Sequence, residues 1–280
     1  GKSTLTNALV GEKIAIVTNK PQTTRNRICA VVNREGCQFV FLDTPGLHKA
    51  RTRLGDYMVK VVKESVADVD AVLLLVEPIP HIGGPEAELI RRIKELNVPA
   101  VLVINKIDTV EKEELLSVMQ VYGAAHDFAA IVPISAKRNE GVDELLGLLA
   151  QFLPEGPQLF PEDMVTDQPE RQVCAEIIRE KLLLCLDKEI PHGTAVEITT
   201  FSERDDGIID LDATIYCEKA SHKGIIIGKG GAMLKKISTL ARTDIEAFMG
   251  TKVFLQTWVK VKENWRDNMN LIKNFGYRDE

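Results

Sequence analysis

Residues 100–108 read Ala-Val-Leu-Val-Ile-Asn-Lys-Ile-Asp, an apolar run followed by an Asn-Lys-x-Asp sequence. The run has the length of a buried β-strand, so the polar residues are predicted to leave the strand at its carboxyl end. A carboxylate there, Asp108, can accept hydrogen bonds from the N1–H and N2–H₂ groups of guanine, whereas adenine offers it no matching donors. We therefore expect Asn105, Lys106 and Asp108 to bind a guanine nucleotide.

Two more polar sequences follow apolar runs of strand length. In Asp43-Thr44-Pro45-Gly46, the Asp43 carboxylate can hold Mg²⁺ and the Gly46 N–H group can sense a γ-phosphate. We also assign Ser135-Ala136-Lys137 to the nucleotide site. Alone, the first sequence suits an ordinary β-turn, and Ser135 and Asp108 are common helix caps. Their occurrence together, in this order and each after a predicted strand, favours a nucleotide site.

The chain opens with Gly1-Lys2-Ser3-Thr4 ahead of a helical pattern, which matches the end of a phosphate-binding loop, G-x-x-x-x-G-K-[ST]. In such a loop the lysine contacts the β- and γ-phosphate oxygens and the hydroxyl ligates Mg²⁺, roles that Lys2 and Ser3 would hold. The tripeptide alone is a weak signal, because it occurs by chance in many proteins. We expect the first strand and the start of the loop to precede Gly1.

The first 155 or so residues alternate between short β-branched apolar runs and stretches with helical spacing. This pattern predicts an α/β domain whose mostly parallel sheet has helices on both faces. The expected strands cover residues 28–32, 38–42, 71–76, 100–104 and 131–134, the first two as an antiparallel hairpin. The expected helices cover residues 4–10, 54–66, 85–96, 110–125 and 142–152, the first closed by Gly11.

A proline-rich stretch divides the chain. Pro154, Pro157, Pro161 and Pro169 predict an extended linker over residues 154–170, between a domain of residues 1–153 and one of residues 171–280. The second domain is predicted to be smaller and α+β, with helices at 171–187 and 232–248, strands at 194–201, 208–217 and 253–261, and a glycine loop before the second helix.

The glycine loop of the second domain contains a GxxG sequence, Gly228 to Gly231. A loop without bulky side chains lets a nucleic-acid backbone approach, while Lys229 supplies positive charge. Between Lys219 and Lys262 there are nine basic and two acidic residues, a local charge of +7. A tight turn and a solvated helix face are the alternative interpretations. The expected RNA contacts are Ile225, Ile226, Gly228, Lys229, Gly230, Gly231 and Lys235.

Several of these assignments stay open. Ile226 also fits a core position. Trp258 and Trp265 have side chains that can stack on bases, but the alternating strand around Trp258 favours a half-buried structural role.

Composition excludes some classes. The net charge is −6, no apolar run approaches the roughly 20 residues that span a bilayer, and the five cysteines form no CxxC pair. We therefore expect an intracellular protein without a disulfide framework or zinc site.

The ordered motifs resemble those of translation-factor-class GTPases. Residues 21–27, Pro-Gln-Thr-Thr-Arg-Asn-Arg, and residues 43–48, Asp-Thr-Pro-Gly-Leu-His, resemble the Era family of ribosome-assembly GTPases. The order of elements in the second domain resembles a type II KH fold. The resemblance implies a P-loop GTPase domain that uses GTP, GDP and Mg²⁺. Lys2, Thr24 and Gly46 would act in catalysis and Ser3, Thr24 and Asp43 would hold the metal, with Thr23 as the rival of Thr24.

The resemblance also implies partners. It predicts binding to the 3′ end of small-subunit ribosomal RNA and to the 30S subunit during assembly, as a cytoplasmic monomer. It leaves open a peripheral contact with the cytoplasmic face of the membrane.

One departure bears on mechanism. Leu47 stands where Ras-like proteins place a water-orienting glutamine, so slow intrinsic hydrolysis is expected. His48 is a substitute, or an exposed histidine without chemistry. Two other interpretations remain: an RNA-binding protein indifferent to nucleotide, with a degenerate GTPase domain, and a GTPase of tRNA modification.

Overall fold

The computed structural model describes residues 1–46, 50, 52–65, 69–96 and 98–277. It divides into two compact units. The first contains Gly1–Ile14, Arg27–His48 and Val62–Asp167, and the second contains Ala15–Asn26, Lys49–Val61 and Gln168–Glu280. Two segments from the predicted GTPase domain therefore cluster with the C-terminal part of the chain, which the proline pattern did not indicate.

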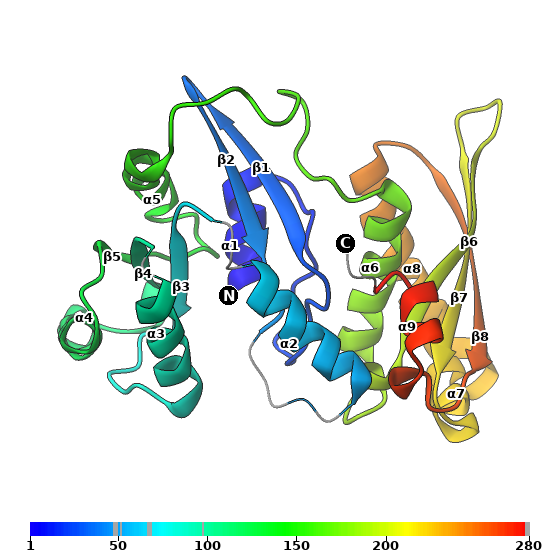
Figure 1. The fold of residues 1–280 in the computed structure, drawn as a ribbon. Helices are drawn as coiled ribbons and strands as arrows, with labels where there is room; N and C mark the ends of the chain where they lie inside the picture. The colour runs from blue at the N-terminus through cyan, green and yellow to red at the C-terminus, as the bar shows by residue number, and fades with distance from the viewer. Residues whose placement is uncertain (47–49, 51, 66–68, 97, 278–280) are drawn as a thin grey trace. The chain divides into compact units, whose positions relative to one another are not determined.

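The strands of the first unit form where the sequence has its short apolar runs (Figure 1). β3 (Val72–Val76), β4 (Ala100–Ile104) and β5 (Ala130–Pro133) form a parallel sheet in the order β3-β4-β5. β1 (Ile28–Arg34) and β2 (Cys37–Asp43) form the expected antiparallel hairpin. Parallel strands place their carboxyl ends at one edge, which brings the loops that follow them together.

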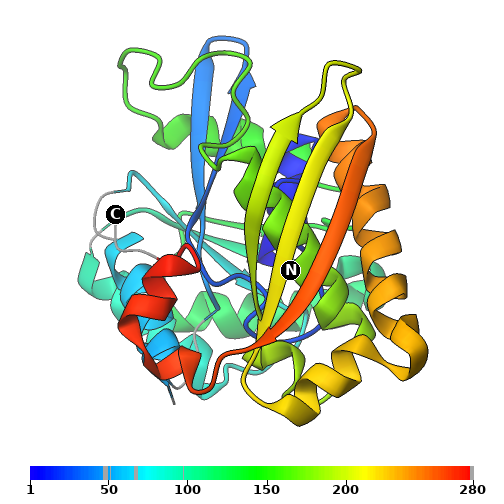
Figure 2. The same ribbon diagram turned by 90° about the vertical axis from the view of Figure 1, so that its right-hand side faces the viewer.

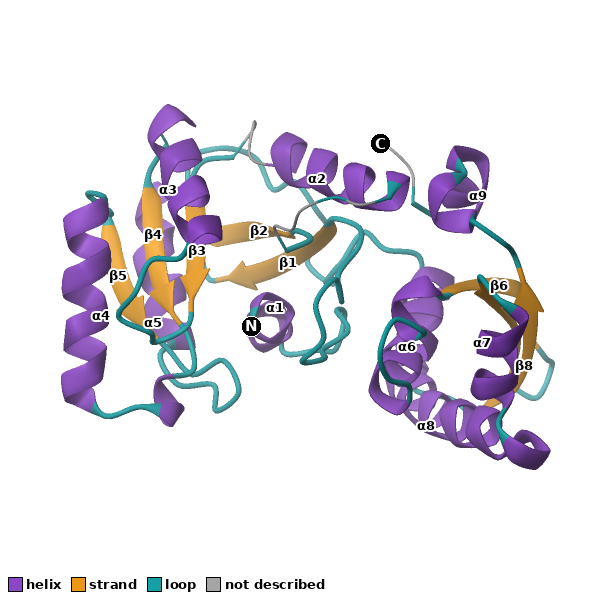
Figure 3. Ribbon diagram, turned by 90° about the horizontal axis from the view of Figure 1, so that it is seen from below, coloured by secondary structure: helices purple, strands orange, loops and turns teal. Residues whose placement is uncertain are grey.

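Helices cover both faces of the β3-β4-β5 sheet (Figure 3). Leu102 and Ile104 of β4 pack with α3 (Gly84–Leu96) and α4 (Lys112–Ala125), while Val101 and Val103 of the same strand pack with α1 (Lys2–Val10) and α5 (Val142–Leu149). Because successive side chains of a strand point to opposite faces, one apolar run serves both layers. The predicted fold class is confirmed.

Up to Asp167, the predicted linker belongs to the first unit and is hydrogen-bonded to the β1-β2 hairpin. The Val31 amide donates to the Val165 carbonyl at 2.9 Å, and Gln38 donates to the Phe160 carbonyl at 2.9 Å. Thr166 forms a bridge with Ala30. Up to Asp167, this stretch is therefore fixed along β1 and β2 rather than free.

The second unit contains a mixed three-stranded sheet with helices packed against it, as expected from the resemblance to a KH fold (Figure 2). Its sheet has the order β6-β7-β8, with β6 (Ala195–Glu203) antiparallel and β8 (Val253–Val261) parallel to β7 (Ile209–Cys217). α6 (Glu170–Cys185) and α8 (Ala232–Met249) share one core with this sheet. Trp265 and the helix α9 (Met269–Asn274) belong to another, together with α2 (Arg53–Ser65).

The largest difference from the expected elements is α7 (Ala220–Ile227), which includes residues assigned to the glycine loop. Short 3₁₀ turns occupy Ile107–Thr109, Ala150–Phe152, Pro191–Gly193, Lys229–Gly231 and Trp265–Asp267. Within the part of the chain that the structure describes, none of the helices combines the length and hydropathy that a membrane crossing requires.

Candidate nucleotide site and RNA-binding surface

Ser3 and Asp43 are forty residues apart in the sequence but form a hydrogen bond in the first unit, where the phosphates of a nucleotide are expected to bind. Ser3 lies in the first turn of α1 and donates from Oγ to Asp43 Oδ2 at 2.8 Å. Asp43 is the last residue of β2 and is 5% exposed. Burial raises the pKa of its carboxyl above the usual value, while Lys2 and the Ser3 hydrogen bond act in the opposite direction. The carboxylate is thus partly compensated by its neighbours.

The same pair suits a magnesium ion. Asp43 Oδ1 is buried and has no hydrogen-bond partner among the described residues. An orphaned carboxylate oxygen beside a hydroxyl is the oxygen-rich setting that Mg²⁺ prefers, with water completing its shell. Lys2 lies close to Gly46, because a Cβ atom added to Gly46 would stand 3.7 Å from Lys2 Nζ. The structure therefore brings together Lys2, Ser3, Asp43 and Gly46, and Thr4 follows in the same turn of α1.

The Asn-Lys-x-Asp and Ser-Ala-Lys loops are joined through Asn105. Its Oδ1 accepts from the amide of Lys106 at 2.7 Å and from the amide of Ala136 at 3.0 Å. Gly1 packs against the same side chain, since a Cβ there would come within 2.9 Å of Asn105 Nδ2. Asn105 is 5% exposed, so it acts as the internal support of the site.

Asp108 is held in position by Ser135, whose Oγ donates to Asp108 Oδ1 at 2.7 Å. This hydrogen bond is the main reason why the pKa of Asp108 lies below its usual value, so the carboxylate is ionised at neutral pH. Arg138, which sequence reasoning missed, places Nε 3.7 Å from Asp108 Oδ2. In the sequence, Arg138 stands out only as a second basic residue directly after Lys137. Lys137 itself is exposed.

Three positions that bear on the expected hydrolysis are Thr24, Leu47 and His48. Leu47 and His48 lie outside the described residues. Thr24 belongs to the second compact unit, where it is buried, and its role as a metal ligand stays a prediction.

The glycine loop has the backbone that a clamp on RNA requires. Gly228 has φ 72°, and a Cβ there would stand 2.8 Å from the Met233 Cβ, so only glycine fits. Gly230 and Gly231 also have positive φ, with open space where side chains would be. Lys229, Lys235 and Ile225 are exposed around this loop. An approaching phosphate backbone would meet N–H groups and positive charge.

The structure corrects one expected RNA contact. Ile226 has no exposed surface and packs into the core with α6 and α8, so it is a structural residue. The neighbouring Ile225 is 49% exposed, because one step along α7 turns the side chain by about 100°. Trp265 is fully buried and donates from Nε1 to the Gly193 carbonyl at 2.9 Å. Trp258 is 45% exposed, more open than its strand pattern indicated.

Comparison with protein families gives two matches. A model described as 50S ribosome-binding GTPase matches residues 1–106, and a KH-domain model matches residues 189–266. The first match covers Lys2, Ser3, Asp43 and Asn105 of the nucleotide site but ends before Asp108 and Ser135, and the second covers the glycine loop.

Similar whole proteins are also found. GTPase Era of Ruminiclostridium cellulolyticum is 52% identical over 99% of this chain and 93% of its own length. GTPase Era of Alkaliphilus metalliredigens is 52% identical over 99% and 94%. Two solved structures match with a TM-score of 0.95 and 37% identity, covering 100% of this chain and 95% of theirs. One is a tyrosine-to-alanine variant of Aquifex aeolicus Era bound to GDP and AlF4⁻, and the other is Era with MgGDPNP and nucleotides 1506–1542 of 16S ribosomal RNA.

Proposed function

The chain belongs to the Era family of GTPases, and we propose that it is a GTP-dependent switch that binds the 3′ end of small-subunit ribosomal RNA during assembly of that subunit. It binds and hydrolyses GTP as a member of this family. The observation that carries the proposal is the presence of two assembled sites in one chain: the Asp108–Ser135 and Ser3–Asp43 pairs, and the open glycine loop.

The nucleotide residues divide the work by position. Asp108 selects guanine, and Asn105 holds its loop against Ala136. Lys2 supplies positive charge to the β- and γ-phosphates, while Ser3 and Asp43 would hold Mg²⁺. The ion, when bound, neutralises charge that develops on the phosphate oxygens.

Two elements respond to the γ-phosphate in this proposal. Thr24 would close on the metal side and the Gly46 N–H group on the phosphate side. Both contacts disappear when phosphate leaves, so hydrolysis resets the switch.

The RNA-binding assignment rests on the loop and its surroundings. Exposed Lys229 and Lys235 flank a glycine backbone that accepts close approach, and Ile225 offers an apolar surface to an unstacked base. The solved Era complex contains nucleotides 1506–1542 of 16S ribosomal RNA, which supports the choice of RNA in this proposal.

The finer partner assignments are part of the same proposal. We place the protein in the cytoplasm as a monomer that meets the 30S subunit. A peripheral contact with the membrane also stays a prediction, and flotation with vesicles of anionic lipid tests it.

The deciding experiment measures RNA binding and multiple-turnover GTP hydrolysis by the full-length protein, with a 3′-end 16S RNA oligonucleotide or a scrambled one of equal composition. We expect the 3′-end RNA alone to bind tightly and to change the turnover rate. Lys229→Gln should weaken that effect, whereas Lys112→Gln on α4 of the first unit should not. Equal binding of both RNAs would refute the RNA assignment. Tight RNA binding without GTP turnover would instead support a nucleotide-independent RNA-binding protein.

A further inference from the structure

Residues 15–26, which we name the strap, include Thr23 and Thr24 but belong to the second unit. The chain on one side of the strap leads to α1 with Lys2 and Ser3, and the chain on the other side leads to β1 and then to Asp43. Thr24 and Arg25 are 7% and 2% exposed. The strap is therefore buried among residues of the RNA-binding unit, while the chain on either side of it continues directly to nucleotide residues.

Arg25 is the most deeply anchored side chain of the strap. Its Nη1 donates to the Thr194 carbonyl at 2.8 Å and to the Tyr277 hydroxyl at 3.0 Å, and its Nη2 donates to the His192 carbonyl at 2.8 Å. The guanidinium lies 5.8 Å from the ring centre of Trp265 and 5.7 Å from that of Tyr277. Planar donors and two aromatic rings fix the orientation of this side chain, which a lysine would not reproduce.

This arrangement is costly for stability alone. Burial lowers the pKa of Arg25, and no carboxylate forms an ion pair with it among the described residues. Its Nε is buried without a hydrogen-bond partner in the same part of the chain. A buried cation held by neutral groups contributes less than a well-packed apolar side chain would. The several hydrogen bonds that orient this side chain therefore favour a positional role over a stabilising one.

Helix α6 holds the rest of the strap. Glu180 accepts from the Val17 amide at 2.9 Å, and Arg179 donates to the Thr23 carbonyl, next to Thr24. Arg179 is fully buried and paired with Glu176, so it has a fixed direction.

The same stretch of α6 forms an ion pair with α8, the helix that follows the glycine loop. Lys181 lies between Glu180 and Asp244, bonded to both, and Asp244 is part of α8. α8 begins directly after the glycine loop. A continuous polar path thus runs from the strap through α6 to the helix that follows the RNA clamp.

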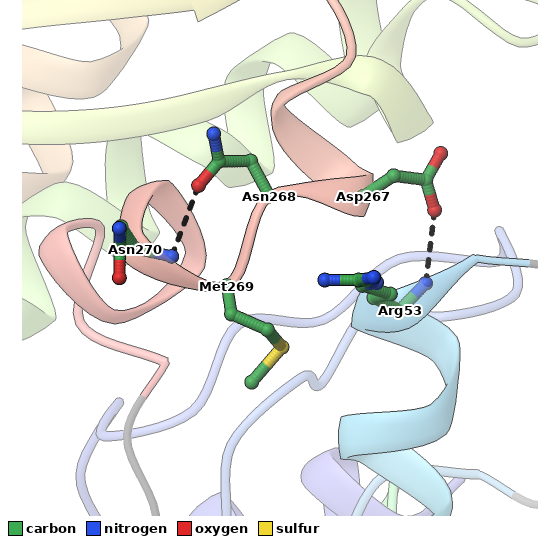
Figure 4. A pocket seen from close by; sticks show the side chains of 5 residues that line it. All are labelled: Arg53, Asp267, Asn268, Met269 and Asn270. Atoms are coloured by element: carbon green, nitrogen blue, oxygen red, sulfur yellow. Dashed lines mark hydrogen bonds between the residues drawn. The ribbon is translucent and has the colours of Figure 1, made fainter.

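The start of α2, which follows the Asp-Thr-Pro-Gly sequence along the chain, is also hydrogen-bonded to the C-terminal segment. The Arg53 amide at the start of α2 donates to Asp267 Oδ1 at 3.0 Å, beside a cavity of about 390 Å³ (Figure 4). Tyr57 of α2 donates to Asn26 Oδ1 of the strap at 3.0 Å. The strap and α2 are therefore held by one another as well as by the segment that ends at Tyr277.

We propose that Arg25 is the positioning residue that couples the two sites: because it is held beside the stacked rings of Trp265 and Tyr277, any movement of Thr24 toward the γ-phosphate is a movement of the RNA-binding unit as well. The inference rests on the proposed function and specifies its physical link. Because coupling is reciprocal, RNA bound at the glycine loop stabilises one position of Thr24 through the same anchor.

The test uses Arg25→Lys, which keeps the charge but loses the planar fork, and Tyr277→Phe, which removes one hydroxyl. Arg34→Lys is the matched control, because Arg34 forms an exposed ion pair with Asp143 on the first unit. For each full-length protein, the RNA Kd is measured at fixed salt with a GTP analogue and with GDP, together with the GDP Kd and a thermal melt.

We expect the ratio of the two RNA affinities to fall by about tenfold in Arg25→Lys and by less in Tyr277→Phe, the size of a typical coupling. The GDP affinity should stay within about twofold, and the control should keep the wild-type ratio. An unchanged ratio in folded Arg25→Lys overturns the inference and leaves the proposed function standing; if that variant does not fold, Tyr277→Phe decides in the same way. A ratio of one in the wild type overturns both, and it is visible before any variant is made.

Discussion

Replacing Asp108 by asparagine should remove guanine specificity while leaving the fold intact. The carboxylate is positioned by the Ser135 hydroxyl at 2.7 Å, and asparagine can still accept that bond through its amide oxygen. The side chain then turns an NH₂ donor toward the N–H donors of guanine. Two charge-assisted hydrogen bonds are lost, and each is worth about 10- to 100-fold in affinity.

The expected result is a loss of GTP affinity of about 100- to 10,000-fold. Xanthine carries an oxygen at C2, so the variant should bind xanthosine triphosphate better than GTP. Isothermal titration with GDP, GTP and their xanthosine counterparts measures both effects. Asp143→Asn, in the first turn of α5, is the matched control and should leave all affinities unchanged.

A GTP affinity within about threefold of wild type would contradict this account of base recognition. A variant that loses GTP without gaining the xanthine nucleotide would indicate that Asp108 supports the loop rather than reading the base. The Ser135→Ala variant separates these cases, because it removes the positioning bond and keeps the acceptor.

Three further outcomes follow from the second unit. Lys181→Met should lower the free energy of unfolding by about 3 kcal/mol, since it leaves Glu180 and Asp244 without their shared cation, and adding Glu180→Gln should restore part of it; chemical denaturation measures both, and a change below 1 kcal/mol would be inconsistent with a buried pair. Burial lowers the pKa of His192, so the unfolded chain binds the proton more readily and the free energy of unfolding should fall as pH drops below about 6.5. The free energy of unfolding of His192→Gln should fall less between pH 7.5 and 5.5, and parallel stability curves for the two proteins would exclude the effect. Lys229→Gln should weaken RNA binding and reduce the salt slope of log K by about 0.7, and an unchanged slope would place Lys229 away from phosphate.

Much of the nucleotide site could be predicted from local pattern. Each candidate loop follows an apolar run, and parallel strands end at a common edge, so the sequence was sufficient to expect Asn105, Asp108 and Ser135 together. The Gly11 cap of α1 was likewise readable, because a left-handed residue after an apolar helix favours glycine.

The remaining features depend on contacts between distant residues. Arg25 bonds to Thr194 across 169 positions, and no periodicity signals such a partner. The resemblance to a KH fold implies a helix before the glycine loop, but local pattern did not give the residues of α7, because Gly224 lowers helix propensity; packing of Ile226 into the core outweighs that cost. The same helical phase decides that Ile225 faces outward while Ile226 does not, which a loop assignment could not reveal.

The most direct measurement of the central claim is the RNA affinity of the full-length protein at one salt concentration, with a GTP analogue, with GDP and without nucleotide. The account predicts that the analogue changes the affinity relative to GDP, and that RNA changes the affinity for the analogue by the same factor. Identical RNA affinities in all three states, with both nucleotides demonstrably bound, would contradict it and would mean that the two sites act independently.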